Sequence, residues 1–495
     1  MLSENSPRRR CFVVADGGSL TTWAGREIVM AQARGEQVHV LNCGEKRLTI
    51  PNVQCRQLGD IRLPKTAAIA SIEEQGPADR ADRVRQTLEL LHRDYAFDAI
   101  DFGVLGGSGF RCLQAKRAGL AFENVELIVH LDQCSQRMRE QNRSWPANIA
   151  DLIIDYIEKD SFESADSQAT ECEEVLHFIR NLNWHIHTDI SVDKRPSVAH
   201  PLVTVGIAHF NLGAYLPATL ESLERQSYRN IEVIVIDDGS TDPASLAAID
   251  EAEERHPTFR FIRQANAGIG ATRNRCLEEA RGEYLIPMDA DNIARPNMVE
   301  RFVAAIERNP ACAAMTCYFL AFDECDSAAP DRFHYAGRPI GGPHALSCIR
   351  NIYGDANGIF RTAIFRELGG YETDRGTSCE DWEAYVKLVH AGHRIGVVPD
   401  YLFYYRHRDA GFSRSTNWFA NHQRVLRQFT HMERLPPGES AVLWTALLGF
   451  QQQAMQLAEK QKARRYRIAD AVQRWASAPR RLYAAFLNRP RPSIR

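Results

Sequence analysis

The chain has 495 residues, and its hydrophobic content of 44% and charged content of 25% are those of ordinary globular proteins. This length allows two or three domains, each large enough for its own core. The net charge of −3 is unevenly distributed, since residues 460–495 contain eleven Lys or Arg residues and one acidic residue. The remaining residues are therefore acidic in sum, and this charge argues against nucleic acid as their partner.

Cysteine usage and apolar runs indicate the compartment. The twelve cysteines form no C-x-x-C pair and no zinc-type cluster with histidine, so we expect reduced, mostly buried thiols in a cytoplasmic protein. Residues 1–10 are polar and basic, and we expect no signal peptide. The apolar run 441–448 is far shorter than the ~20 residues that a membrane span needs, so no span is expected.

Residues 11–195 alternate strand patterns with helix patterns. This alternation predicts a parallel, doubly wound α/β domain. We expect strands at 12–15, 38–41, 97–100 and 125–130, and helices around 28–33, 84–92 and 110–118. A glycine-rich turn is expected at 103–109.

A polar, proline-bearing connector at 194–201 predicts a domain boundary. The α/β pattern then restarts and predicts a second domain over 202–425. Its expected strands are 203–207, 231–236, 260–262 and 284–288, and its expected helices are 215–225, 246–255 and 271–280. Residues 436–495 have a mainly helical pattern.

The strand at 284–288 ends in Asp289-Ala290-Asp291. Carboxylates at positions i and i+2 point the same way and must face water, a cation or a hydrogen-bond donor. A divalent metal carrying a nucleoside diphosphate satisfies this demand. Taken alone, the pair is weak evidence for a metal site, because short acidic loops are common and most of them are only turns.

Two further loops follow the same logic. Asp237 and Asp238 come directly after a strand, where parallel sheets bind ligands, and a carboxylate there can accept hydrogen bonds from a base or a ribose. Residues 266–274 lead glycines into a helix, which can bring backbone N–H groups and Arg273 near phosphate. Each loop alone also fits an ordinary turn or loop-to-helix junction.

The segment Glu380-Asp381-Trp382 opens a predicted helix. Thr377 and Glu380 have the spacing of a capping box, so Glu380 is expected to cap the helix. Asp381 is then left to act as a general base beside an acceptor. His407 follows an apolar strand and could add an imidazole to a metal site, although a single histidine is more often a packed or surface residue.

In their order along the chain, these motifs resemble the inverting glycosyltransferases of family 2, which have the GT-A fold. The resemblance covers about residues 202–420. Its matching segments are 204–211, Asp237-Asp238-Gly239-Ser240-Thr241-Asp242, 266–274, Asp289-Ala290-Asp291, Gly369-Gly370-Tyr371 and Glu380-Asp381.

The resemblance implies roles on the donor side. Asp238, with Asp237 beside it, would hold uracil or another pyrimidine base. Asp289 would contact the ribose or the metal, and Asp291 would ligate Mn²⁺ or Mg²⁺ on the diphosphate. Arg273 would join the donor site.

Further roles come from the same resemblance. Asp381 would deprotonate the acceptor hydroxyl, with Glu380 and Trp382 on the acceptor side. His407 would be another metal or diphosphate ligand. Ala208 stands in the donor site where the family usually has Thr.

The predicted function is therefore metal-dependent, inverting transfer of a sugar from a UDP- or dTDP-sugar to a hydroxyl of a glycan or lipid-linked acceptor, in polysaccharide or glycoconjugate assembly. The alternative is a catalytically inactive nucleotide- or glycan-binding scaffold. A nucleotidyltransferase is disfavoured because a basic, glycine-rich phosphate loop is missing near its start. Residues 331–357 are predicted to form a mobile acceptor-side loop.

The first domain resembles the N-terminal half of GT-B glycosyltransferases of the family 4 type. The segments that carry this resemblance are Asp16-Gly17-Gly18, Val38-His39-Val40-Leu41, 115–122 and Asp155-Tyr156-Ile157-Glu158. It implies a truncated module that binds the acceptor or is degenerate, without catalysis of its own.

The basic tail mixes Lys and Arg with aromatic residues. This composition predicts a helix lying on an anionic membrane surface, peripheral to the inner face of the plasma membrane. A surface helix docked on the rest of the protein is the alternative.

Overall fold

The computed structural model describes residues 7–14, 23–63, 76–144, 146–181, 200–323, 333–408 and 416–429, with Gly411 and a few positions between 440 and 460. Residues 1–443 form one compact unit and residues 444–495 another. Asp16-Gly17-Gly18, most of the connector 194–201 and, apart from Lys460, the basic tail 460–495 lie outside the described residues. Among the helices that are described, none is long and apolar enough to cross a membrane.

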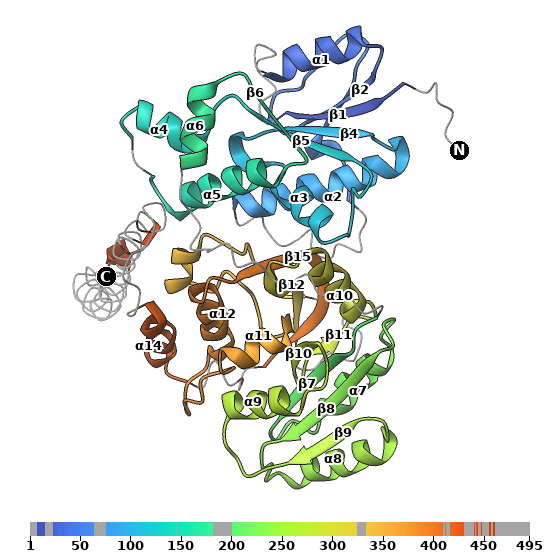
Figure 1. The fold of residues 1–495 in the computed structure, drawn as a ribbon, viewed down its shortest axis with the longest axis vertical. Coiled ribbons are helices and arrows are strands. Elements are labelled where there is room, and N and C mark those ends of the chain that lie inside the picture. Colours follow the sequence, from blue (N-terminus) through green and yellow to red (C-terminus); the bar gives the residue numbers. More distant parts are fainter. Residues whose placement is uncertain are drawn as a thin grey trace, which may run out of the picture. The chain divides into compact units, whose positions relative to one another are not determined.

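The first sheet contains six strands, all parallel, in the order β3-β2-β1-β4-β5-β6 (Figure 1). Its strands are β1 (Arg9–Val14), β2 (Gln37–Asn42), β3 (Gln54–Gln57), β4 (Ala99–Gly103), β5 (Glu126–Leu131) and β6 (Ser167–Thr170). The helices between them are α1 (Trp23–Ala33), α2 (Pro77–Tyr95), α3 (Phe110–Arg117), α4 (Ser135–Gln141), α5 (Ile149–Ser164) and α6 (Glu173–Asn181).

Both faces of this sheet are buried, as a parallel sheet with crossover helices requires. Phe12 of β1 packs with Ile28 of α1, whereas the next residue, Val13, packs on the opposite face with Val84 and Leu88 of α2. The predicted parallel α/β fold is confirmed here. The strands β3 and β6 were not predicted, because each has four mainly polar, half-exposed residues.

The second sheet is mixed and runs in the order β11-β15-β12-β14-β10-β7-β8-β9, with β13 paired to β12 (Figure 1). Its first half is parallel and contains β7 (Val203–His209), β8 (Ile231–Asp237), β9 (Arg260–Arg263) and β10 (Tyr284–Asp289). The remaining strands are β11 (Ile293–Ala294), β12 (Cys312–Asp323), β13 (Tyr335–Gly337), β14 (Ile359–Arg361) and β15 (Arg394–His407).

The helices of this part are α7 (Leu216–Glu224), α8 (Pro243–Arg255), α9 (Ile269–Glu279), α10 (Met298–Arg308), α11 (Thr362–Glu367), α12 (Glu380–His390) and α14 (Trp418–Phe429). The continuous apolar run of β8 packs in the core with α7 and α10 through Val233, Leu220 and Phe302. Because β7, β8 and β10 are parallel neighbours, their polar ends all emerge at one edge of the sheet.

Within residues 1–443, side chains from the helices of the first sheet pack against the second sheet. Arg111 of α3 is buried, with its guanidinium over the rings of Phe110 and Tyr318. The Tyr318 hydroxyl donates to Asp82 of α2 at 3.3 Å. The division of this unit into separate domains stays a prediction, as does the likeness of its first part to GT-B enzymes.

Candidate active site

A cavity of about 890 Å³ collects the predicted residues of the second sheet. Its volume falls in the range of sites that hold drug-sized ligands. The predicted residues in its wall are Ala208, Asp238, Arg273, Asp289, Asp291, Glu380, Asp381, Trp382 and His407. Motifs separated by about two hundred residues along the chain therefore meet at one place.

Asp237 is not in this wall but supports it. Its Oδ1 accepts from the ring Nδ1 of His209 at 3.0 Å and from the hydroxyl of Ser240 at 2.5 Å. The His209 Nε2 accepts from the backbone N–H of Leu212 at 3.3 Å, so the proton resides on Nδ1. Burial lowers the pKa of His209 although Asp237 works in the opposite direction, and the ring is a neutral bridge.

Asp238 fixes the loop that opposes it. Its Oδ1 accepts from the Ala267 N–H at 2.8 Å and its Oδ2 from the Gly268 N–H at 2.8 Å, while Gln264 donates to Oδ1 at 2.8 Å. Gly239 has a φ of 71°, and a Cβ there would lie 2.8 Å from the backbone of Asn266. Only glycine fits this turn, and the carboxylate holds the start of α9 at the cavity.

Arg273 lies on α9 and joins two parts of the wall. Its Nη2 donates to Asp289 at 2.6 Å, and its Nη1 donates to Glu380. Burial opposes the charge of Arg273, but Asp289 and Glu380 outweigh it and raise its pKa. This arginine holds the first residue of α12 next to the end of β10.

The predicted capping box at the start of α12 is wrong. Cys379 is the N-cap residue, with a φ of 71° and no side-chain cap bond. The carboxylate of Glu380 instead pairs with Arg273. Thr377 accepts from Arg424 at 3.1 Å. A buried guanidinium attracts a carboxylate more strongly than an exposed backbone N–H does, and no local pattern in the sequence indicated Arg273 as the partner of Glu380.

Asp291 faces an arginine and a second carboxylate. Arg408 Nε donates to its Oδ2 at 2.6 Å. Burial, with Asp289 next in importance, raises the pKa of Asp291 to about 6 despite Arg408. The two carboxylates of the Asp-x-Asp motif therefore repel each other in a partly dry place.

Asp355 adds to this negative potential. Burial, Asp289 and Asp381 raise its pKa well above the ordinary value for a carboxyl group. Asp289, Asp291, Asp355 and Asp381 all line the same cavity. A cation in this cavity would stabilise the ionised forms of Asp291, Asp355 and Asp381, whose pKa values are raised.

Asp381 follows Glu380 in the first turn of α12 and is one of five residues that line both cavities, together with Tyr335, Asn351, Asp355 and Tyr405. It lines the 890 Å³ cavity and also a second cavity of about 520 Å³. The N–H of Trp382 donates to its Oδ1 at 2.7 Å. Burial first, and then Glu380, raise the pKa of Asp381 to about 7. A carboxyl group with this pKa can take a proton near neutral pH.

The second cavity is lined by helices that cover the first sheet and by segments next to the second sheet. Gly76 and Asp79 at the start of α2 and Ile153 of α5 lie on one side, and Arg338 and Asp355 lie on the other. Part of the predicted loop 331–357 thus lines it, including all of β13. The same loop also contains a 3₁₀ turn at His344–Cys348.

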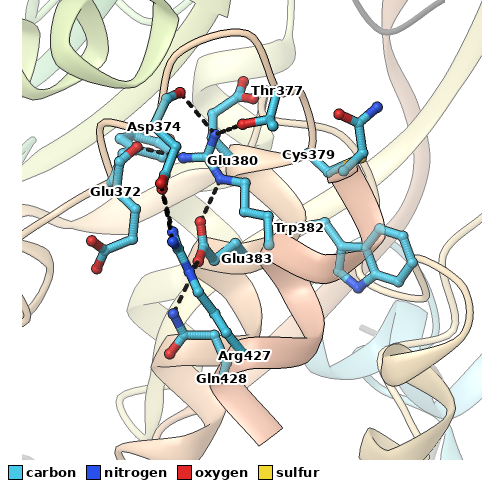
Figure 2. Close-up of polar contacts among 12 residues, drawn as sticks. Glu372, Asp374, Thr377, Cys379, Glu380, Trp382, Glu383, Arg427 and Gln428 are labelled. Carbon is cyan, nitrogen blue, oxygen red and sulfur yellow. Dashed lines mark hydrogen bonds and ion pairs between the residues drawn. The ribbon is translucent and has the colours of Figure 1, made fainter. Parts of the chain in front are cut away.

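A partly buried ion cluster holds α12 in place (Figure 2). The carboxylate of Glu383 accepts from Arg424 at 2.5 Å, from Arg427 at 2.8 Å and from Gln428 at 3.0 Å. Arg427 also pairs with Asp374. The cluster ties α14 to α12, the helix that carries Asp381 in its first turn.

His407 is in the wall of the larger cavity, but its neighbours are unexpected. Its ring groups with Asp323 and His334, and their ligand atoms all lie within 4.8 Å of one another. This group does not include Asp291, which pairs with Arg408. The predicted partnership of His407 with Asp291 stays a prediction.

Sequence reasoning missed several residues of the site. Glu383 and Arg408 were adjacent to recognised motifs, and their polar character next to a buried pattern was the available signal. Asp355 and Arg424 lie outside any motif, so a single sequence offered nothing to select them.

Comparison with known proteins gives one family. Residues 204–369 match the model described as glycosyl transferase family 2. This segment includes Ala208, Asp238, Asp289 and Asp291 but ends before Asp381. The parts of the chain outside it are not covered by the match.

Curated relatives carry the same activity in their names. EpsE of Bacillus subtilis, a glycosyltransferase by name, is 26% identical over 229 residues, which cover 46% of this chain and 80% of that protein. Glycosyltransferase GlyG of Streptococcus pneumoniae is 32% identical over 126 residues, covering 25% of this chain and 41% of that protein. EpsH of Bacillus subtilis and a Haemophilus influenzae glycosyltransferase match over 30% and 36% of their lengths, about a third of each.

Two solved structures are distantly similar. Staphylococcus aureus TarS with UDP-GlcNAc has a TM-score of 0.40 and 18% identity, covering 50% of this chain and 71% of that one. The mannosyltransferase PcManGT of Pyrobaculum calidifontis, with GDP-Man and Mn²⁺, has a TM-score of 0.39 and 21% identity, covering 57% and 82%.

Proposed function

Because residues 204–369 belong to glycosyl transferase family 2, we propose that this protein transfers a sugar from a nucleoside-diphosphate donor to a hydroxyl group of an acceptor, with inversion at the anomeric carbon. The observation that carries this proposal is the position of Asp381. It lies in the walls of both cavities, with its pKa raised to about 7. A base in this place can serve a reaction between molecules bound on its two sides.

The larger cavity is the proposed donor site. Gly268 and Ile269 at the start of α9 and the polar ends of β7, β8 and β10 line it. Its volume of about 890 Å³ suits a nucleotide sugar. UDP- and dTDP-sugars are the proposed donors, with Asp238 on the base side and Asp289 near the ribose.

The reaction is a single displacement. The acceptor oxygen forms a bond to the anomeric carbon while the bond from that carbon to the diphosphate oxygen breaks. The departing diphosphate keeps the electron pair, and the acceptor proton passes to Asp381. One displacement on the face opposite the leaving group inverts the anomeric configuration.

The carboxylates fit a divalent metal. Burial and the neighbouring Asp289 raise the pKa of Asp291, and hard divalent ions bind one or two carboxylates together with substrate phosphates. Asp291 and Asp289 would hold Mn²⁺ or Mg²⁺. The bound ion would supply charge compensation for the leaving diphosphate.

The smaller cavity is the proposed acceptor site. Its wall includes the start of α2 and α5, which gives the first sheet's helices a part in acceptor binding. Arg338 and Arg350 in the same wall favour an acceptor with acidic or hydroxyl-rich groups. A glycan or lipid-linked glycan has such groups, and assembly of a polysaccharide or glycoconjugate is the proposed setting. The name of a relative, the chondroitin synthase of Escherichia coli, 38% identical over 100 residues, supports a polymer product.

A cytoplasmic location with peripheral contact to an anionic membrane is part of the proposal. It rests on the eleven basic residues in 460–495. Deleting 460–495 is expected to reduce co-sedimentation with anionic vesicles, and unchanged co-sedimentation would contradict the membrane contact.

The function is tested with a panel of UDP- and dTDP-sugars in the presence of Mn²⁺. We expect slow sugar release from at least one donor, and faster release when a suitable acceptor is added. Binding of nucleotides without turnover of any donor would favour the inactive scaffold and contradict the enzyme.

A further inference from the structure

Two histidines and an aspartate meet at the rim of the larger cavity. Asp323 is the last residue of β12, His407 is the last residue of β15, and His334 directly precedes β13. The imidazole nitrogens and the carboxylate oxygen lie within 4.8 Å of one another. The ring centres of the two histidines are 5.5 Å apart.

Main-chain pairing fixes this meeting. Asp323 and His407 are direct partners in the parallel pairing of β12 with β15. The N–H of His334 donates to the carbonyl of Ala321 at 2.9 Å, and Tyr335 pairs with the same residue. The three side chains therefore come from three adjacent strands, whose ladders set their spacing before any ligand arrives.

Stability alone does not account for the group. His334 pairs with Asp323, and the two side chains are 44% and 60% exposed. An ion pair this exposed contributes little to stability. An arrangement of two imidazoles and a carboxylate has a clear chemical use, because transition metal ions prefer imidazole nitrogen and accept carboxylate oxygen.

We propose that Asp323, His334 and His407 bind one divalent transition metal ion of the Zn²⁺ type, at a site separate from Asp289 and Asp291. Three protein ligands leave coordination positions for water or for an oxygen of a bound molecule. His407 and its neighbour Tyr335 line the larger cavity, so these positions are at the edge of that cavity.

Two observations separate this site from the Asp-x-Asp motif. The Asp291 carboxylate is held by Arg408, and neither Asp289 nor Asp291 belongs to the group of three. The three-residue site needs no nucleotide, since all of its protein ligands are already within reach of one ion. The Asp289–Asp291 pair, in contrast, needs phosphate oxygens to complete its coordination. The proposal therefore holds or fails independently of sugar transfer.

The test uses the full-length protein without a histidine tag, stripped with a chelator and titrated with Co²⁺ and Zn²⁺ in the absence of nucleotide. We expect one equivalent of Co²⁺ to bind with visible d–d absorption, and Zn²⁺ to displace it. His334→Ala and Asp323→Asn should each weaken binding by at least about tenfold, because both remove a direct ligand. Circular dichroism checks that the variants are folded.

Two control variants complete the experiment. His177→Ala removes an exposed histidine far from the cluster in sequence, and Asp291→Asn alters the other candidate metal site. Both should bind Co²⁺ as the unaltered protein does. Failure of the unaltered protein to bind Co²⁺, binding that survives His334→Ala and Asp323→Asn, or loss of binding in Asp291→Asn would each overturn the proposal.

Discussion

The parallel strands of both sheets end in polar groups, but the carboxylates at the two edges have different partners. At the first sheet, the Glu158 carboxylate of α5 accepts from the Gly106 N–H at 2.6 Å and from the Ser135 N–H at 2.8 Å. The chain's own carboxylate thus occupies backbone donors of the kind that bind phosphate in related α/β sheets. At the second sheet, Asp238 occupies the N–H groups of Ala267 and Gly268 in the same way, but further carboxylates line one cavity together and are compensated only in part by arginines.

This contrast teaches how one architecture can serve two purposes. Burial raises the pKa of Glu158 to about 7, while its hydrogen bonds with Ser135 and Gly106 act in the opposite direction. These internal hydrogen bonds close the edge of the first sheet. The repelling carboxylates of the second sheet store electrostatic free energy that a cation and a substrate can release. Carboxylates that repel one another in a shared cavity indicate a ligand site, whereas a carboxylate that is held by internal hydrogen bonds indicates a structural edge.

The largest effect that we expect is the loss of transfer rate on substitution of Asp381, and it tests whether the second sheet's edge is the catalytic one. We predict that Asp381→Asn lowers the transfer rate about a thousandfold, as loss of a general base does. The nucleotide should still bind within about threefold of its normal affinity, because the contacts of the donor cavity remain. Steady-state kinetics and calorimetric titration with UDP measure the two quantities. A transfer rate within tenfold of normal would remove Asp381 as the base.

The second effect concerns how the active edge is held. Arg424→Met should lower the free energy of unfolding by about 3 kcal/mol, since it leaves the buried Glu383 without its closest partner. Arg427→Met is the matched control, because Arg427 pairs with the same carboxylate from a 40% exposed position and should cost less than about 1 kcal/mol. Urea unfolding measures both. Equal losses would show that burial does not distinguish the two arginines.

The third effect tests the metal pair. Asp291→Asn should lower Mn²⁺-dependent turnover about a hundredfold and weaken Mn²⁺ binding in the presence of UDP, while the thermal midpoint stays the same or rises. Asp250→Asn is the control, because Asp250 pairs with Arg263 on the surface. Unchanged turnover in Asp291→Asn would contradict the metal assignment.

The smallest effect sharpens the contrast from the first sheet. Glu158→Ala should cost about 2 kcal/mol of unfolding free energy, because the partly buried N–H groups of Gly106 and Ser135 lose their acceptor. The transfer rate should stay within about threefold. Glu174→Ala, at an 83% exposed partner of Arg137, is the control and should cost almost nothing. A tenfold loss of rate in Glu158→Ala would mean that the first edge also takes part in catalysis.

Much of the fold followed from local patterns. Continuous apolar strands such as β8 and β10 were predicted at their positions because burial leaves a strong local pattern in the sequence. The edge strands β3 and β6 were missed because half-exposed polar residues carry no such pattern.

The site divided in a similar way. Asp238, Asp289 and Asp381 were found because each follows a strand or opens a helix in a recognisable motif. The partners that decide their chemistry were not predictable, because contacts such as Arg273 with Glu380 and Arg408 with Asp291 join residues over one hundred positions apart. The capping box failed for this reason, since a tertiary ion pair overrode a local preference.

The most direct test of the central claim is the pH dependence of kcat/KM for transfer by the unaltered protein. Asp381 must be ionised to take a proton, and burial followed by Glu380 raises its pKa to about 7. The ionised fraction therefore grows as the pH rises, and we predict that kcat/KM increases about tenfold per pH unit below 7 and levels off above it. A profile that is flat between pH 5.5 and 8.5, or that falls as the pH rises through 7, would contradict the assignment of Asp381 as the base between two substrate cavities.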